Sequence, residues 1–287
     1  MDKIGIILLN YNAYEDTKEC IESLKAMTYP NYEIFVVDND SQDGSADRLK
    51  QLKDIYFIES GRNGGFGYGN NIGIKAAIKQ GCQKILLLNN DTTVEPDFLS
   101  ILNQNLVDSR IGMIAPKILN YYDRNKIWAL GGEINWPLFV AYNSLCDQED
   151  HHQVIKKKVD FISGCCMLIR SEIFEEIGYL PEDYFMYFED LDFCLQVSNK
   201  YELWVDSSAV IYHKVSAASG EDSPFQLEWV NRSQFKFMKR YGPQRPKYAQ
   251  YRRQLYLRKW ARIVSYLMKF DYSRAHAIYK GIKKSSK

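Results

Sequence analysis

The sequence predicts an α/β protein built on a mainly parallel, doubly wound sheet. Short apolar runs alternate with stretches of helical periodicity between residues 3 and 88, which is the order of a βαβ chain. The run Ile85–Leu88 is apolar at every position, as expected of a central strand covered on both faces. Polar residues follow each apolar run, at the edge where open α/β sheets bind ligands.

The first half of the chain divides into four predicted strands and the helices between them. The strands are expected at Lys3–Leu9, Tyr32–Val37, Ile55–Glu59 and Ile85–Leu88. The helices are expected at Tyr14–Met27, at Ser45–Leu52, and from the Gly/Asn-rich loop Arg62–Gly73 through Lys79. Their apolar residues recur at helical spacing, whereas the strand runs are short and continuous.

The second half is less regular. Helices are expected at Asp97–Val107 and Glu172–Ile177 and from Glu189 onward, and strands at Met113–Ile118, Phe161–Arg170, Leu203–Asp206 and Ala209–His213. Residues 120–158 are the least regular part and read, from their residues alone, as an ordinary surface insertion rich in aromatic residues.

Composition and cysteine usage set limits on the class of protein. With 287 residues and 46% hydrophobic content, the chain can bury a full core, which argues against general disorder. The first residues lead straight into a predicted strand, so no signal peptide is expected. No apolar stretch reaches 18 residues, so no membrane span is expected. None of the six cysteines forms a Cys-x-x-Cys pair, which suggests reduced core thiols in a cytoplasmic protein.

Charge is distributed unevenly along the chain. Residues 224–287 carry 17 Lys and Arg against 2 acids, and residues 1–223 carry 20 against 34. Aromatic and basic residues interleave in the basic tail, which is typical of an interfacial amphipathic segment on an anionic membrane. Two alternatives stay open, namely a helix packed on the body with a solvated basic face and a nucleic-acid surface.

Carboxylates and amides follow the predicted strands. Asp91, with Asn89 two residues earlier, can hold a hard divalent cation against a diphosphate. Asp38 can accept a hydrogen bond from a base or a ribose, and Asn10 and Asn12 can bond the same groups. The alternatives are ordinary polar turns and caps, with a helix starting from Thr92 after Asp91. No P-loop is present, and the glycine-rich run does not follow the first strand as a Rossmann fingerprint would.

Taken together, these motifs resemble glycosyltransferase family 2 and, within it, the rhamnosyltransferase-like branch. The resemblance covers about residues 3–215 and implies the GT-A nucleotide-diphospho-sugar fold. It rests on Leu9-Asn10-Tyr11-Asn12, Val37-Asp38-Asn39 with Asp43-Gly44-Ser45, Asn63-x-Gly65-Phe66 with Asn71 and Gly73, and Leu88-Asn89-Asn90-Asp91-Thr92.

The resemblance implies roles for these residues. The implied donor-binding residues are Asn10, Asn12, Asp38, Asn39, Asn63, Asn71 and Asn90. Asp91 matches the last aspartate of the family's Asp-x-Asp metal motif, but Asn89 replaces the first, which leaves its part as a ligand open. His213 resembles the family's C-terminal metal-binding histidine. The implied ion is Mn²⁺ or Mg²⁺.

Three carboxylates lie within four residues of an aromatic run that ends at Cys194. They resemble the family's acceptor motif, whose aspartate is the general base. The base is therefore expected at Asp190, beside Glu189, with Asp192 as the second choice. A single base of this kind implies inversion at the anomeric carbon. Acids in the first turn of a helix are the simpler interpretation, and both can hold together.

The sequence thus predicts an inverting, metal-dependent glycosyltransferase at the cytoplasmic face of the cell membrane. Its GT-A domain is expected at residues 1–223, with the donor half at about 1–118 and the acceptor half at about 119–223, and its helical extension at 224–287. The first donor to consider is dTDP-rhamnose, with UDP-linked galactofuranose, N-acetylglucosamine, glucose or galactose as alternatives. The acceptor is expected to be a polysaccharide or a lipid-linked glycan.

Partners and rival functions complete these expectations. No nucleic acid is expected as a partner, and a homo-oligomer stays open. A sugar nucleotidyltransferase is disfavoured, because its glycine-rich, basic first loop is missing. A non-catalytic basic scaffold that binds membrane or nucleic acid is the rival from another class.

Overall fold

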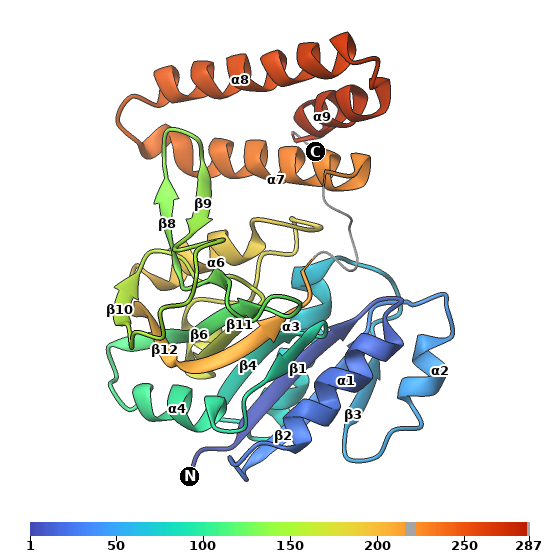
Figure 1. Ribbon diagram of the computed structural model, residues 1–287, viewed down its shortest axis with the longest axis vertical. Coiled ribbons are helices and arrows are strands. Elements are labelled where there is room, and N and C mark those ends of the chain that lie inside the picture. Colours follow the sequence, from blue (N-terminus) through green and yellow to red (C-terminus); the bar gives the residue numbers. More distant parts are fainter. Residues whose placement is uncertain (216–221, 286–287) are drawn as a thin grey trace.

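A computed structural model describes residues 1–215 and 222–285 (Figure 1). Its strands are β1 (Ile4–Asn10), β2 (Tyr32–Asp38), β3 (Tyr56–Glu59), β4 (Lys84–Asn89), β5 (Thr92–Val94), β6 (Ile111–Asn120), β7 (Ile127–Ala129), β8 (Gly132–Asn135), β9 (Val140–Asn143), β10 (Lys156–Val159), β11 (Cys166–Arg170) and β12 (Glu202–His213). Its α-helices are α1 (Tyr14–Lys25), α2 (Ser45–Leu49), α3 (Phe66–Lys79), α4 (Phe98–Asn105), α5 (Glu172–Glu176), α6 (Glu189–Val197), α7 (Pro224–Tyr241), α8 (Tyr248–Met268) and α9 (Tyr272–Lys284).

The main sheet is mixed and mostly parallel. Its order is β10-β12-β6-β11-β4-β1-β2-β3, and β11 runs antiparallel to both of its neighbours. The predicted α/β class and doubly wound sheet are confirmed. The strand register pairs Asn10 with Asp38 and Leu9 with Asn89. The polar residues that end β1, β2 and β4 therefore lie at one edge of the sheet.

Three local predictions need correction. Thr92 and Thr93 begin strand β5, which pairs with β12, rather than a helix. The threonines and Val94 are β-branched and fit a pleated strand better than a helix. The two runs expected at 203–206 and 209–213 form the single strand β12, with an irregularity between Asp206 and Val210. Region 120–158 contains four short strands, including the β8–β9 hairpin.

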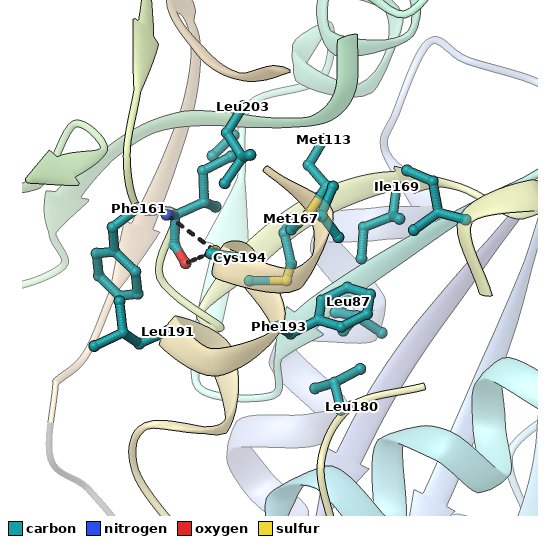
Figure 2. Close-up of a cluster of buried hydrophobic side chains, with 14 of the residues drawn as sticks. Leu87, Met113, Phe161, Met167, Ile169, Leu180, Leu191, Phe193, Cys194 and Leu203 are labelled. Atoms are coloured by element: carbon teal, nitrogen blue, oxygen red, sulfur yellow. Dashed lines mark hydrogen bonds between the residues drawn. The ribbon is translucent and has the colours of Figure 1, made fainter. Parts of the chain in front are cut away.

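A buried apolar cluster fixes α6 on the sheet. Figure 2 shows Leu191, Phe193 and Cys194 of α6 facing side chains from β4, β6 and β11. The Cys194 thiol also lies 3.4 Å from both the backbone nitrogen and the carbonyl oxygen of Ile162. Because this core is dry and closely packed, the first turn of α6 has a defined position above the start of β11.

Helices α7, α8 and α9 form a layer outside the sheet (Figure 1). Phe235, Phe237 and Met238 of α7 are buried, and a smaller cluster that includes Leu227, Ile263 and Ile278 joins the three helices. The open alternative of a helix packed on the body is therefore correct for α7. Within the described ranges, no helix is both long and apolar enough to cross a membrane.

Candidate active site

A buried hydrogen-bond network joins the ends of β1 and β2. Asn10 Nδ2 donates to Asp38 Oδ2 at 2.7 Å, and both residues are almost fully buried. Thr17 Oγ1 donates to Asn10 Oδ1 at 2.8 Å and accepts from Asn90 Nδ2 at 2.8 Å. The network therefore brings together the residues predicted at three strand ends. Thr17 was not predicted, because nothing in the helical pattern of α1 marks its polar partner.

The Asp38 carboxylate is held by the loop that follows it. Ser41 donates to it twice, from its backbone nitrogen at 2.9 Å and its hydroxyl at 2.6 Å. The same hydroxyl accepts from the backbone nitrogen of Asn12 at 2.9 Å, and Asn12 Oδ1 accepts from the backbone nitrogen of Gln42 at 2.7 Å. Three hydrogen bonds to one carboxylate leave Asp38 little capacity for a ligand, so it mainly fixes the shape of both loops.

A glycine-rich turn connects this edge to the loop before α6. Asn39 Nδ2 donates to Asn63 Oδ1 at 3.1 Å and to the Gly65 carbonyl at 3.3 Å. Gly65 has a φ of +90°, and a Cβ there would lie 2.0 Å from the Phe185 carbonyl oxygen. Phe66 N donates to the same carbonyl at 2.9 Å. Only glycine permits this approach, which anchors the loop that carries Phe185.

Asn71, which the resemblance implies as a donor-side residue, makes three hydrogen bonds within the protein. It is buried in α3, and both its N–H groups are used, one toward the Leu180 carbonyl and one toward Glu182 Oε1, each at 2.9 Å. Its Oδ1 accepts from the backbone nitrogen of Leu180 at 3.1 Å. These three bonds join α3 to the segment that follows α5.

Asp91 and His213 form a nearly buried pair. Asp91 Oδ1 lies 3.1 Å from His213 Nε2, although 122 positions separate them in sequence. Strand β12 places His213 opposite Thr92 of β5, and the Trp128 ring packs edge-on against the imidazole with centroids 4.5 Å apart. Within residues 1–215 and 222–285, His213 Nδ1 finds no hydrogen-bond partner. Among the described residues, the imidazole thus has the Asp91 carboxylate as its polar contact and the Trp128 ring as its packing contact.

This pair fits a divalent cation. Two neighbouring ligands of an octahedral ion with bonds of about 2.1 Å lie about 3 Å apart, as Oδ1 and Nε2 do here. An oxygen and an imidazole nitrogen together suit Mn²⁺ better than Mg²⁺. The described residues contain no group of three or more His, Cys, Asp or Glu side chains that could hold a metal. Other ligands would therefore have to come from a phosphate, from water or from an amide such as Asn89.

Asp190 lies at the first turn of α6. Its Oδ2 accepts from Gly164 N at 2.9 Å and its Oδ1 from Leu191 N at 2.8 Å. Burial raises the pKa of the Asp190 carboxyl, and these N–H groups oppose the rise. Gly164 precedes Cys165, whose carbonyl accepts from Asn89 N at 2.8 Å. The backbone therefore connects Asp190 directly to the end of β4, two residues from Asp91.

Glu189 is a second, more deeply buried acid. Burial and the adjacent Asp190 charge raise its pKa well above the usual range. Its Oε2 is buried with no hydrogen-bond partner in the described part of the chain. A buried, unpaired carboxyl favours its neutral form. Of the two acids, Glu189 is therefore the one whose neutral form is favoured more strongly.

Asp192, the second choice for the base, already accepts several hydrogen bonds. Its side chain is fully buried, and it accepts hydrogen bonds from Tyr241 Oη at 2.5 Å, from Gln196 Nε2 at 2.8 Å and from the Arg240 guanidinium. These donors hold the carboxylate toward α7. Arg240 and Tyr241 of α7 were not predicted as partners of Asp192, because in the sequence they are two members of a basic, aromatic tail.

Removing the Arg240 cation should destabilise the fold. In Arg240→Leu the Asp192 carboxylate stays buried without its main counter-charge. Breaking one side of such a pair costs about 3 kcal/mol, which corresponds to a fall in Tm of about 6–12 °C. Thermal unfolding measured by circular dichroism at pH 7 tests this.

Arg262→Leu is the matched control for this experiment. It removes the same side chain from the same helical layer, but the Arg262–Asp222 pair is exposed on both sides. Such pairs contribute at most about 1 kcal/mol. Equal destabilisation by the two substitutions would show that the Arg240–Asp192 contact has no special role.

Comparisons with known proteins identify the family. A family model described as glycosyl transferase family 2 matches residues 5–178. A low-salt glycan biosynthesis hexosyltransferase, Agl10 of Haloferax volcanii, is 32% identical over 203 residues, which are 68% of this chain and 61% of the relative. A dTDP-rhamnosyl transferase, RfbF of Shigella flexneri, is 23% identical over 199 residues, 68% of this chain and 63% of the relative. The chain thus spans about six tenths of the length of these relatives.

A solved structure shows the same fold. A mannosyltransferase from Pyrobaculum calidifontis, in complex with GDP-Man and Mn²⁺, superposes with a TM-score of 0.62 at 13% identity, covering 99% of this chain and 87% of the other. At this identity the similarity concerns the fold alone. It extends over nearly the whole chain.

Proposed function

Because this chain belongs to glycosyl transferase family 2 and has a GT-A fold, we propose that it transfers a sugar from a nucleotide-diphospho-sugar to an acceptor hydroxyl. One observation carries the proposal. The Asp91–His213 pair lies where β5 pairs with the end of β12, and Asp190, in the first turn of α6, is linked to the nearby end of β4 through the Gly164–Asp190 and Asn89–Cys165 hydrogen bonds. A diphosphate site with a base nearby is what glycosyl transfer requires.

Asp190 is the proposed general base. An acceptor hydroxyl gives its proton to Asp190 as its oxygen forms a bond to the anomeric carbon. The bond between that carbon and the diphosphate oxygen breaks with its electron pair going to the nucleoside diphosphate. One displacement with one base inverts the anomeric centre. Burial supports this role, because it makes Asp190 a stronger base than an exposed aspartate.

Asp91 and His213 are the proposed metal ligands, with Asn89 as a further candidate. A bound Mn²⁺ or Mg²⁺ would stabilise negative charge on the departing diphosphate. The donor-binding edge is assigned to Asn10, Asn12, Asp38, Asn39, Asn63 and Asn90. Asp38 and Asn10 shape this edge from the buried side, whereas Asn12 and Asn90 lie nearer the surface.

The proposed donor is a pyrimidine-nucleotide sugar, with dTDP-rhamnose first and a UDP-sugar as the alternative. The name of the Shigella flexneri relative supports the first choice. The proposed acceptor is a growing polysaccharide or a lipid-linked glycan, which agrees with the glycan-biosynthesis role in the name of the Haloferax volcanii relative. A lipid-linked acceptor would place the protein at the inner face of the cell membrane, held there through residues 224–287.

A nucleotide panel tests the proposed function. Thermal unfolding is measured with Mn²⁺ and dTDP, UDP, GDP, CDP or NAD, each at about 100 times its expected Kd. Binding to the native state at that ratio contributes about 2.7 kcal/mol, so Tm should rise by about 5 °C. We expect the rise with dTDP or UDP and not with NAD. No shift with any nucleoside diphosphate would contradict the transferase proposal and favour a non-catalytic basic scaffold.

A further inference from the structure

Helix α8 carries an uncovered apolar stripe. Leu257, Trp260, Val264, Leu267 and Met268 are between 43% and 71% exposed. Their spacing of three or four residues places them on one side of the helix. Contiguous exposed apolar surface of this kind usually marks an interaction site.

The opposite side of α8 is already used by the fold. Leu255 and Ile263 are buried, and the Tyr256 ring packs against Phe235 of α7 with centroids 4.8 Å apart. The helix therefore has one apolar side that holds it to the protein and a second that is largely exposed, where Trp260 lies beside the Tyr279 ring of α9 with centroids 6.4 Å apart. Phe270, two residues beyond the helix, is 78% exposed.

The charge around the stripe has one sign. Helix α8 contains five basic residues and no acid, and Lys269 follows it. Arg253 and Arg258 are exposed beside the stripe. The nearby acid Asp271 is already bound to Arg274, with Oδ2 2.6 Å from the guanidinium. An apolar stripe bordered by cations is complementary to a partner surface that has an apolar interior and negative charges at its boundary with water.

We propose that this face of α8, Leu257–Met268 together with Phe270, docks on an anionic lipid surface. This inference rests on the proposed function, in which residues 224–287 hold the protein at a membrane. It restricts the binding surface from that whole basic tail to one face of α8. The apolar side chains would enter the boundary between headgroups and acyl chains, and the arginines would bind headgroup phosphates.

Two other occupants fit less well. A second copy of the same face would bring arginine against arginine, and like charges across an interface oppose binding. Nucleic acid would satisfy the cations but leave the exposed leucine, valine and methionine side chains in water. Only a lipid surface uses both properties of the face.

Docking through α8 also suits the location of the candidate site. In Figure 1 the amino terminus, and so the start of β1, lies at the end of the body far from the extension. Helix α7 lies between the body and α8 (Figure 1), and the Arg240–Asp192 bond connects α7 to the helix that carries Asp190. The helical layer that would dock is thus joined to the helix that carries the proposed base.

Vesicle co-sedimentation of the full chain tests this inference. The probes are vesicles of phosphatidylcholine alone and of phosphatidylcholine with about one third phosphatidylglycerol. We expect at least tenfold tighter binding to the anionic vesicles. The double variant Leu257→Ser/Val264→Ser should weaken that binding about tenfold, and Arg253→Gln/Arg258→Gln should make it less sensitive to salt.

Val107→Ser/Val154→Ser is the matched control. It removes two valines that are at least as exposed, at 81% and 76%, but lie on the body. We expect it to bind vesicles like the wild type. All variants should keep the circular dichroism spectrum and the nucleotide-induced rise in Tm, so a failure of docking is separable from a failure of the proposed function.

Three outcomes would overturn the inference. One is absence of wild-type binding to anionic vesicles. Another is unchanged vesicle binding by Leu257→Ser/Val264→Ser. The third is a wild-type dimer in sedimentation velocity that the same substitutions convert to monomer, which would assign the face to a second copy of the chain.

Discussion

Asp190→Asn is expected to lower kcat by about 10²–10⁴-fold while leaving nucleotide binding intact. The asparagine keeps the size of the side chain, and its Oδ1 can still accept one of the N–H groups that hold Asp190. It cannot take a proton from the acceptor, and general-base catalysis contributes about this factor. Transfer measured with a saturating donor checks the rate, and the rise in Tm with Mn²⁺ and nucleotide checks binding.

Glu189→Gln is the informative comparison. Burial and the adjacent charge raise the pKa of Glu189, which favours its neutral form, and glutamine imitates a neutral carboxylic acid. We therefore expect Glu189→Gln to lower kcat by less than about tenfold. If Glu189→Gln abolished transfer and Asp190→Asn did not, the roles of the two acids would be reversed.

The pH dependence of the transfer rate is a second test of Asp190 as the general base. A base must be ionised to act, and burial makes Asp190 hold its proton to a higher pH than an exposed aspartate does. The wild-type rate should therefore fall as pH decreases through a value above 3.8, the ordinary pKa of the group. Asp190→Asn should lose this acidic limb. If Asp190→Asn kept the same fall in rate at low pH, that fall would have to come from the titration of another group.

The parts of the site that could be predicted from sequence are those that follow local patterns. Apolar runs that end in Asn10, Asp38 and Asn89 identify strand ends, and parallel strands bring such ends to one edge. The start of α6 at Glu189 was likewise expected, because acids favour the first turn of a helix.

The remaining parts depend on contacts between distant segments. The resemblance implied Asp91 and His213 as ligands of one ion, but the contact between them could not be derived from local patterns, because it depends on the pairing of β5 with β12. The bond from Arg240 to Asp192 joins residues 48 positions apart, and no periodicity marks one arginine among the many in the tail. Asn71 is a similar case. In the sequence its amide suits a donor-binding site and a structural contact equally well, and its hydrogen bond to Leu180 is visible only in the structure.

Asp91→Ala is expected to abolish metal-dependent nucleotide binding and to lower kcat/KM by about 10³-fold or more. It removes the negative ligand of the Asp91–His213 pair and leaves a neutral imidazole that alone binds a hard cation weakly. Stabilisation of a leaving diphosphate by a metal is worth several kcal/mol, and about 1.4 kcal/mol corresponds to tenfold in rate.

Trp128 offers a direct readout that does not require turnover. Its ring touches His213, and paramagnetic Mn²⁺ bound there should quench its fluorescence. We expect saturable quenching in the wild type that is lost in Asp91→Ala and much reduced in Trp128→Phe. Asp97→Ala is the matched control, because Asp97 is an exposed aspartate six residues further along the same segment. A cation held by Asp91 and His213 must lose affinity in Asp91→Ala, because the substitution removes the only charged ligand of this pair. Equal quenching in Asp91→Ala and Asp97→Ala would therefore show that the ion binds elsewhere.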